Sequence, residues 1–428
     1  MSARAVTPVG RPLHATVTVP GSKSIANRAL LCAALADGMC RLEGLSDGDD
    51  TVAMIDCLGR LGIDVQVVDQ VARIKGGAGR LPVGPIVLPT RLAGTTSRFL
   101  TALAALGPGP YIIDGEAPLR ARPMGPLHDA LIAMGAIVHA MDRPGHLPVQ
   151  IRAGEPHEKQ AVVRIRGDVS SQYISALMMI APYLRHGLRL ELTTALVSLP
   201  YVEMTASVMA SFGVGSVATT VVNDRHVIEV GPGRYQPTDY VIEPDASSAS
   251  YPFAAAAIAG GSVRVNGLRT PSLQSDARFV DALAQMGCEV VRDDRGVEVR
   301  RSGALHGITI DMRDFSDTAP TMAVVAAVAG SPTRVTGIGF IRGKESDRIG
   351  DVVNELRRCG VDAEAEPDGF IVRPGGLHGA RVSTYHDHRV AMSFALLGLV
   401  TPGIEIEDPG VVSKSLPGFW HLLDTLSN

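Results

Sequence analysis

The sequence predicts an α/β protein built from two similar compact domains. An apolar, helix-like run recurs six times along the chain, at spacings of roughly 70 to 77 residues. Each run is followed by an alternating apolar and polar stretch, which is typical of a strand. A length of 428 residues is more than one hydrophobic core usually supports. Because solenoids normally use shorter repeats, we expect two domains of three repeats each.

The six runs share small apolar residues and open at Ser, Thr or Asp. They are SIANRALLCAALA from Ser24, TTSRFLTALAAL from Thr95, SQYISALMMIAPY from Ser171, SSASYPFAAAAIA from Ser247, TAPTMAVVAAVA from Thr318 and DHRVAMSFALLGL from Asp387. These residue types cap helices, and a helix N-terminus carries roughly half a positive charge. Six helix ends are therefore available for anions, although simple capping explains any single one of them.

A second helix pattern in each of the first five repeats stops at a glycine. Glycine directly after a helix is the usual left-handed terminator. Each repeat therefore reads as strand, helix, strand, helix and one or two further strands. The five stops are Gly62, Gly135, Gly213, Gly287 and Gly360.

The domain boundary is expected between the third and fourth repeats, near residues 240–244. This places repeats one to three in residues 22–242 and repeats four to six in residues 243–428. The segment before Gly21 could pair with either half by its pattern, and we assign residues 1–21 to the second domain.

Composition restricts the kinds of partner. The formal net charge of -4 disfavours a nucleic-acid stripe or a polybasic membrane surface. The N-terminus lacks an apolar signal region and no apolar run is long enough to span a membrane, so we expect a cytoplasmic protein. The five cysteines form no C-x-x-C pair, which indicates buried, reduced thiols.

Lysine is rare in this chain: only five of its 40 basic residues are Lys. A genome-wide preference for Arg codons explains the skew. A Lys that persists is then more often found where a compact ammonium is needed. The five are Lys23, Lys75, Lys159, Lys344 and Lys414.

Several familiar motifs are absent. The stretch around Lys23 resembles a phosphate-binding loop, but Thr16 stands where that motif needs its first glycine. His388 has no second His or Cys at ligand spacing, so we expect no metal site. The G-x-S-x-G pattern of serine hydrolases is also missing.

The remaining polar candidates are mostly cations and hydroxyl groups, with a few acids. Such a set suits two small, multiply anionic substrates and group transfer by side chains alone, without a cofactor. The candidates are Lys23, Arg28, Arg122, Lys344, Arg348, Arg389, Lys414, Ser24, Ser170, Ser171, Ser198, Tyr201, Asp317 and Glu345.

Six segments occur in an order and at separations that resemble one enzyme family. They are VPGSKSIANRALLCAALADG, LAGTTSRFL, DVSSQYISAL, GKESDRI, YHDHRVAM and KSLPGF. Together they span nearly the whole chain and resemble the EPSP synthase family, the 3-phosphoshikimate 1-carboxyvinyltransferases. The resemblance implies two domains of three βαβαββ repeats, the inverse α/β barrel of enolpyruvyl transferases, with the active site in the interdomain cleft.

The resemblance also implies a reaction. The enolpyruvyl group of phosphoenolpyruvate moves to the 5-hydroxyl of shikimate 3-phosphate, and phosphate is released, in the pathway to chorismate and the aromatic amino acids. No cofactor, nucleic acid or membrane is implied, and we expect a monomer. Because Gly94 adds no bulk beside phosphoenolpyruvate, glyphosate is an expected inhibitor.

Site roles follow by matching position to the family. Asp317 and Glu345 become the base and the acid, and Lys23 neutralises the leaving phosphate. The residues implied for shikimate 3-phosphate are Lys23, Ser24, Arg28, Ser170, Ser171, Gln172, Ser198, Tyr201, Asp317 and Lys344. Those implied for phosphoenolpyruvate are Lys23, Gly94, Thr95, Arg122, Gln172, Arg348, Arg389 and Lys414.

The chain departs from the family at Leu92 and Phe340, where many relatives carry Asn, and at Leu199, which is often Lys. Two alternatives stay open at this point. One is a related transferase acting on a UDP-sugar or a nucleotide, although no Cys lies near Leu119, where the sugar-nucleotide enzyme commonly carries one. The other is an anion-binding protein without catalysis.

Overall fold

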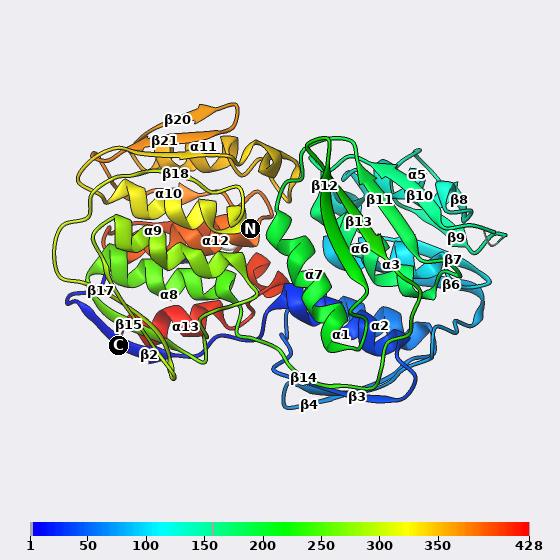
Figure 1. Ribbon diagram of the computed structural model, residues 1–428. Coiled ribbons are helices and arrows are strands. Elements are labelled where there is room, and N and C mark those ends of the chain that lie inside the picture. Colours follow the sequence, from blue (N-terminus) through cyan, green and yellow to red (C-terminus); the bar gives the residue numbers. More distant parts are fainter. Residues whose placement is uncertain (1–2, 156–157, 428) are drawn as a thin grey trace. The chain divides into compact units, whose positions relative to one another are not determined.

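The computed structural model describes residues 3–155 and 158–427, which form two compact units (Figure 1). Unit 1 comprises Met1–Pro20 and Glu243–Asn428, and unit 2 comprises Gly21–Ile242. Unit 1 is therefore built from two separate stretches of chain, with unit 2 inserted between them.

Unit 2 contains three four-stranded sheets. Each sheet has one parallel pair of strands, and a hairpin adds two antiparallel strands beside it. In spatial order the sheets are β14 (Asp239–Val241), β3 (Met39–Glu43), β5 (Val71–Lys75), β4 (Asp64–Val68); β6 (Val83–Pro89), β7 (Gly109–Asp114), β9 (Val149–Arg152), β8 (Ile137–Ala140); and β10 (Ala161–Ile165), β11 (Leu188–Leu192), β13 (Arg225–Val230), β12 (Val217–Val222).

The first helix of each repeat of unit 2 lies at the centre of the unit. These helices are α1 (Lys23–Leu35), α3 (Gly94–Ala104) and α6 (Ser171–Ile180), which contact one another. Nearly all of the residues of these three helices are buried. This explains why their sequences do not show the solvent-facing polar stripe of a surface helix. The remaining helices are α2 (Asp49–Arg60), α4 (Ala117–Arg120), α5 (Gly125–Ala133), η1 (Ala181–Tyr183) and α7 (Leu199–Ser211).

Unit 1 repeats this plan with one shortened sheet. Its sixth repeat contributes only two strands, and the N-terminal strand β1 pairs antiparallel with β23 to complete a sheet of three. The sheets are β2 (Leu13–Val17), β15 (Gly261–Asn266), β17 (Gly296–Arg301), β16 (Glu289–Asp293); β18 (Thr309–Asp311), β19 (Thr333–Thr336), β21 (Gly369–Arg373), β20 (Asp362–Glu366); and β1 (Ala3–Ala5), β23 (Glu405–Glu407), β22 (Arg381–Val382).

The central helices of unit 1 are α8 (Ala246–Ala259), α10 (Ala319–Ala327) and α12 (His388–Ala395), again buried on almost every side. The fold class predicted from the repeats is thus confirmed. The other helical segments are η2 (Ser275–Arg278), α9 (Phe279–Gln285), η3 (Ser316–Thr318), η4 (Gly339–Gly343), α11 (Gly350–Arg358), η5 (Leu396–Leu399), η6 (Pro409–Lys414) and α13 (Phe419–Ser427).

The first strands of repeats one and four come from unexpected parts of the chain. Strand β2 directly precedes α1 in sequence, but it pairs in parallel with β15 of unit 1. The matching position in repeat one is filled by β14, which pairs in parallel with β3. The N-terminal segment, which the pattern left open, therefore belongs to unit 1 through both β1 and β2.

The five predicted glycine stops are confirmed. Each follows the second helix of its repeat and has a φ between +77° and +106°, in the left-handed region that favours glycine. A Ser or Asp side chain caps four of the six central helices, as the residue types predicted. Only Asp387 is the residue at which a predicted run opens, and in the other three the cap is the earlier residue Ser22, Ser170 or Asp245.

The capping prediction is wrong for α3 and α10. Helix α3 begins after Ala93, which has no acceptor, and the Thr95 hydroxyl instead accepts from the Gln172 amide. At α10 the Thr318 hydroxyl donates to the Phe315 carbonyl. In both places the hydroxyl has a partner other than the helix end.

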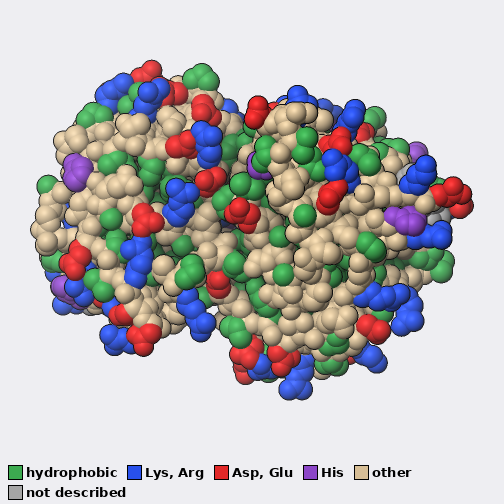
Figure 2. Space-filling view, viewed as in Figure 1, with side chains coloured by type: hydrophobic (Ala, Val, Ile, Leu, Met, Phe, Trp, Pro, Cys, Tyr) green, Lys and Arg blue, Asp and Glu red, His purple; other side chains and the backbone are tan. Residues whose placement is uncertain are grey.

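Side chains of both signs are interspersed over the face shown in Figure 2. Among the described residues, no helix combines the length and apolar character needed to cross a membrane. All five cysteines are buried and unpaired, as predicted.

Candidate active site

In unit 2, the start of α1 carries an ion pair. The Lys23 ammonium lies 2.9 Å from Asp50 Oδ2, and Asp50 stands in the first turn of α2. The Lys23 side chain is 14% exposed and that of Asp50 is 3% exposed. The pair holds the Lys23 ammonium in place at the start of α1.

The starts of α3 and α6 are joined by their side chains. The Gln172 amide donates to Thr95 Oγ1 at 3.2 Å, and Ser170 caps α6 by accepting from the backbone N–H of Gln172 at 3.3 Å. Ser171, the first residue of α6, is buried. The expected residues Thr95, Ser170, Ser171 and Gln172 are therefore brought together within unit 2.

Gly94 begins α3 directly beside an arginine. A Cβ placed on Gly94 would lie 2.6 Å from Arg122 Nη1 and 3.3 Å from Arg98 Nη1. Arg98 is buried and donates to the Gly94 and Pro123 carbonyls. The absence of a side chain at Gly94 thus allows the Arg122 guanidinium to approach the N-terminus of α3.

Arg28, an expected residue for shikimate 3-phosphate, is buried within unit 2. It is 2% exposed and donates to Ser24 O, Thr205 Oγ1, Ser175 Oγ and Tyr201 O. Burial lowers the pKa of Arg28 to about 10. Since a guanidinium has five N–H groups, one on Nη1 remains within the described residues, and most of the side chain serves to tie α1 to α6 and α7.

The start of α7 is strained at Ser198. This residue is buried and has φ +56° and ψ +45°, in the left-handed region. An L residue pays roughly 1–2 kcal/mol for that conformation. Strain of this kind gathers at ligand sites, and Tyr201 follows one turn later on the same helix. Both were expected to contact shikimate 3-phosphate.

In unit 1, Arg348 is the centre of an ionic cluster. It is 2% exposed, and its Nε lies 2.7 Å from Asp387 Oδ2. Its Nη1 lies 3.1 Å from Asp317 Oδ1, and its Nη2 lies 2.9 Å from Glu345 Oε2. Burial alone would lower the pKa of Arg348, but the three carboxylates more than offset it and the pKa is raised.

Two further cations complete this cluster. Arg389 Nη2 lies 2.7 Å from Asp317 Oδ2, and Lys414 Nζ lies 3.1 Å from Glu345 Oε1. Both cations are buried. Asp317 and Glu345, the expected base and acid, are therefore each held between two cations, which fixes the direction of their oxygens.

Two carboxylates of these groups were not predicted as site residues. Asp50 pairs with Lys23, and Asp387 pairs with Arg348 while capping α12 through the Arg389 N–H. Asp387 was visible only as a helix cap, and Asp50 only as one of three acids at the start of a helix. Neither pairing is encoded in local sequence, because the partners are 27 and 39 residues apart.

Two further positions noted in the sequence are Lys344 and Phe340. Lys344 is half-buried at the end of η4. Phe340, where relatives often carry Asn, packs against the hydrophobic core of unit 1 and cannot supply an amide. The described residues hold no cluster of three His, Cys, Asp or Glu side chains suited to a metal ion.

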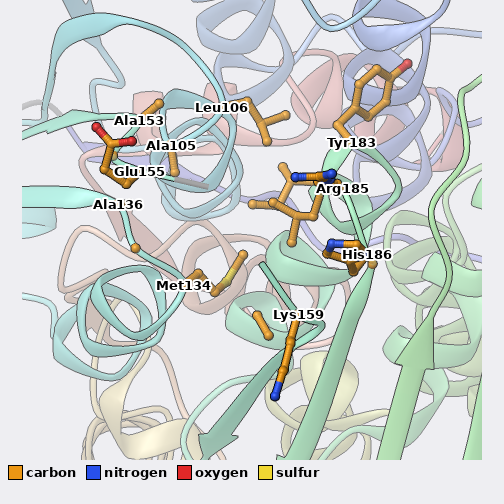
Figure 3. Close-up of a pocket in the computed structure, with 16 residues that line it drawn as sticks. Ala105, Leu106, Met134, Ala136, Ala153, Glu155, Lys159, Tyr183, Arg185 and His186 are labelled. Carbon is orange, nitrogen blue, oxygen red and sulfur yellow. The ribbon is translucent and has the colours of Figure 1, made fainter. Parts of the chain in front are cut away.

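Unit 2 also contains a cavity of about 180 Å³, shown in Figure 3. Ala105 and Leu106, directly after α3, and Ile180, the last residue of α6, line it. It therefore lies at the carboxyl ends of helices whose opposite ends carry Gly94 and Gln172. Helix carboxyl ends carry partial negative charge, and none of the expected site residues lines this cavity. It is not part of the candidate site.

The fold and these two groups of residues define a repeat-built α/β protein in which buried cations are paired with carboxylates. Comparison with known proteins agrees. A family model described as EPSP synthase (3-phosphoshikimate 1-carboxyvinyltransferase) matches residues 8–423. The chain therefore belongs to the EPSP synthase family.

Relatives and solved structures support this assignment over the full length. A 3-phosphoshikimate 1-carboxyvinyltransferase of Trichormus variabilis is 43% identical over 422 residues, which is 98% of each chain. One of Methanoculleus marisnigri is 41% identical over 413 residues, 96% of each chain. The structure of an EPSP synthase from Acinetobacter baumannii superimposes with a TM-score of 0.82 at 25% identity, covering 99% of this chain and 97% of the other.

Proposed function

We propose that the chain transfers the enolpyruvyl group of phosphoenolpyruvate to the 5-hydroxyl of shikimate 3-phosphate and releases phosphate. The observation that carries the proposal is the unit 1 cluster, in which Asp317 and Glu345 are held by Arg348, Arg389 and Lys414. Family membership supplies the reaction class, and this cluster supplies an acid, a base and cations for the phosphate.

For shikimate 3-phosphate we propose the residues at the starts of α1, α6 and α7. Hydroxyl and ammonium groups there suit a phosphate and a polyhydroxylated ring. Arg28 contributes at most its remaining Nη1 hydrogen, since its other donors are occupied. The full set is Lys23, Ser24, Arg28, Ser170, Ser171, Gln172, Ser198 and Tyr201 from unit 2, with Asp317 and Lys344 from unit 1.

For phosphoenolpyruvate we propose cations from both units. A backbone N–H at the start of α3 adds to them, because a helix N-terminus favours an anion. The unit 1 cations already have carboxylate partners, which keep them charged and oriented before substrate arrives. The set is Lys23, Gly94, Thr95, Arg122 and Gln172 of unit 2, with Arg348, Arg389 and Lys414 of unit 1.

The reaction has two steps, an addition and an elimination, and each step requires two proton transfers. Asp317 removes the proton of the 5-hydroxyl as its oxygen bonds to C2 of phosphoenolpyruvate, and Glu345 gives a proton to C3. In the second step Glu345 removes a proton from C3, the bond from C2 to the phosphate oxygen breaks, and Asp317 returns its proton to the phosphate. Lys23 stabilises the charge on the leaving phosphate.

We also propose that the chain acts as a cytoplasmic monomer with no nucleic acid, membrane or cofactor as a partner. Its five unpaired buried thiols suit a reducing compartment. The mixed charges of Figure 2 do not form the basic stripe that a nucleic acid would need on that face.

The direct test of function is phosphate release from phosphoenolpyruvate by the purified chain. We expect release only when shikimate 3-phosphate is present, together with one new enol ether derived from it. Equal or faster release with a UDP-sugar or with UMP would assign the chain to a different transferase. If no phosphate is released with any of these acceptors, the transfer reaction is contradicted.

Substitution of Gly94 by Ala tests the phosphoenolpyruvate site. The new methyl group would lie 2.6 Å from Arg122 Nη1, and a flexible side chain moves more easily than the helix. Displacing one charge-assisted hydrogen bond costs about 1.5 kcal/mol, so KM for phosphoenolpyruvate should rise about tenfold with little loss of stability. We also propose that glyphosate competes with phosphoenolpyruvate at this position.

Gly59→Ala is the matched control, because Gly59 lies in helix α2 with no atom within 4 Å of its added Cβ. Its KM should be that of the parent chain. An equal KM for phosphoenolpyruvate in the Gly94 and Gly59 variants would show that Arg122 does not bind this substrate.

A further inference from the structure

Two carboxyl groups of unit 1 lie on neighbouring 3-10 turns, Asp276 on η2 and Asp317 on η3. The two turns are in contact, and Ser275 Oγ donates to the Asp314 carbonyl at 2.5 Å. Asp317 belongs to the ionic cluster described above. Asp276 was not anticipated from the sequence and takes no part in the proposed proton transfers.

The turn that carries Asp276 is fastened to the N-terminus of α8. Gln274 Oε1 accepts from the backbone N–H of Ala246 at 2.9 Å. Asp276 Oδ2 accepts a hydrogen bond from Ser247 Oγ, on the same end of the helix. These contacts fix the position of the Asp276 carboxyl, so it has no freedom to turn toward solvent.

The two carboxyls differ sharply in their partners. Both oxygens of Asp317 are bound by arginines, Arg348 at 3.1 Å and Arg389 at 2.7 Å. Asp276 is 4% exposed, and its Oδ1 has no hydrogen-bond partner among residues 3–155 and 158–427. A buried carboxylate that is not hydrogen-bonded to a cation is costly, and protonation relieves that cost. Consistently, burial and then the charge of Asp317 raise the pKa of Asp276 to about 7.

We infer that Asp276 is a positioning residue that acts through Asp317. At slightly acidic pH it holds a proton, so the carboxyl pair carries a single negative charge, which sits on Asp317 where Arg348 and Arg389 orient it for proton abstraction. The inference rests on the proposed role of Asp317 as the base of the reaction.

Loss of the Asp276 proton would place a second negative charge in this region. The charged groups that face it are Asp317 from η3, Arg389 from α12 and Asp245 at the start of α8. Asp281 of the adjoining helix α9 is directed to the surface, where it pairs with Arg292. The second charge competes with substrate for Arg389, so binding of phosphoenolpyruvate should weaken as the pH rises through about 7.

The kinetic test is the pH dependence of kcat/KM for phosphoenolpyruvate in Asp276→Asn. One added like charge is worth at least about one pKa unit of interaction, so the parent chain should lose about tenfold between about pH 6.5 and about pH 8.5. The Asn variant, which cannot ionise, should stay nearly flat over that range. Parallel profiles for the two proteins would overturn the inference.

Asp314→Asn is the matched control. Asp314 lies on the same stretch before η3, but its carboxylate pairs with Arg278 and is 35% exposed. This variant should follow the profile of the parent chain. A flat profile in the Asp314 variant as well would show that any nearby carboxyl has the same effect, and the special role of Asp276 would be wrong.

A second readout needs no substrate and therefore survives failure of the proposed function. The folded-state pKa of Asp276 is raised above 3.8, so its contribution to stability is present at low pH and is lost as the pH rises toward about 7. Between about pH 5 and about pH 8, the unfolding temperature of the parent chain should fall relative to that of Asp276→Asn. A constant difference between the two would show that Asp276 is ionised throughout, whatever reaction the chain catalyses.

Discussion

Arg348→Met should destabilise the chain by about 3–5 kcal/mol and abolish turnover. Arg348 is 2% exposed and lies within hydrogen-bond distance of the carboxylates of Asp387, Asp317 and Glu345. Met has a similar volume, so the loss comes from charge rather than from packing. The three carboxylates would be left with Arg389 and Lys414 as the remaining cations of the cluster, and Asp387, which is fully buried, would lose its arginine. Urea-induced unfolding measures the change in stability.

Arg334→Met is the control for this prediction. Arg334 also binds a carboxylate through two nitrogens, both at 2.9 Å from Glu366, but its side chain is 52% exposed. Exposed pairs of this kind contribute about 0–1 kcal/mol. Equal losses of stability in the two variants would mean that burial does not determine how much the cluster contributes to the free energy of unfolding.

Removing either proposed proton-transfer group should lower kcat by a factor of about 10²–10⁴ without weakening the binding of phosphoenolpyruvate. Asp317→Ala removes a negative charge that competes with anionic substrates for Arg389, so KM for phosphoenolpyruvate should not rise. Glu345→Gln does the same for Lys414. Steady-state kinetics separates kcat from KM, and calorimetry checks that both substrates still bind.

The control for these variants is Asp314→Ala, three residues before Asp317 and paired at the surface with Arg278. It should keep the kcat of the parent chain. Normal turnover in Asp317→Ala would remove this residue from the mechanism. A loss confined to KM would instead leave Asp317 with a binding role alone, without a part in proton transfer.

Much of the fold could be predicted from local pattern because the repeats are encoded locally. The central helices are rich in small apolar residues and buried on almost every side, and a glycine after the second helix of the first five repeats fixes its end. The placement of β2 and β14 could not be predicted in the same way. Strand pairing depends on contacts across the chain, and β2 pairs with β15, whose residues lie some 250 positions later.

Candidate site residues could be predicted where a residue type is rare in this chain, as lysine is. Lys23 and Lys414 lie in the two ionic groups and Lys344 is half-buried, whereas Lys75 and Lys159 are exposed. The counter-ions were missed. Asp50 and Asp387 resemble ordinary helix-start residues in sequence, and Asp276 resembles a surface acid until its burial is known. Burial and pairing arise from tertiary contacts, which a local pattern does not record.

The most direct test of the proposed acid and base is a reaction run to completion in deuterium oxide. Protonation of C3 by Glu345, whose proton exchanges with solvent, adds deuterium to a methyl group before one hydrogen is removed again. The product should therefore carry deuterium in its vinyl methylene group, and Glu345→Gln should lose this incorporation together with turnover. Product formed in full yield by the parent chain without deuterium would contradict the mechanism, because the transfer would then occur without protonation of C3.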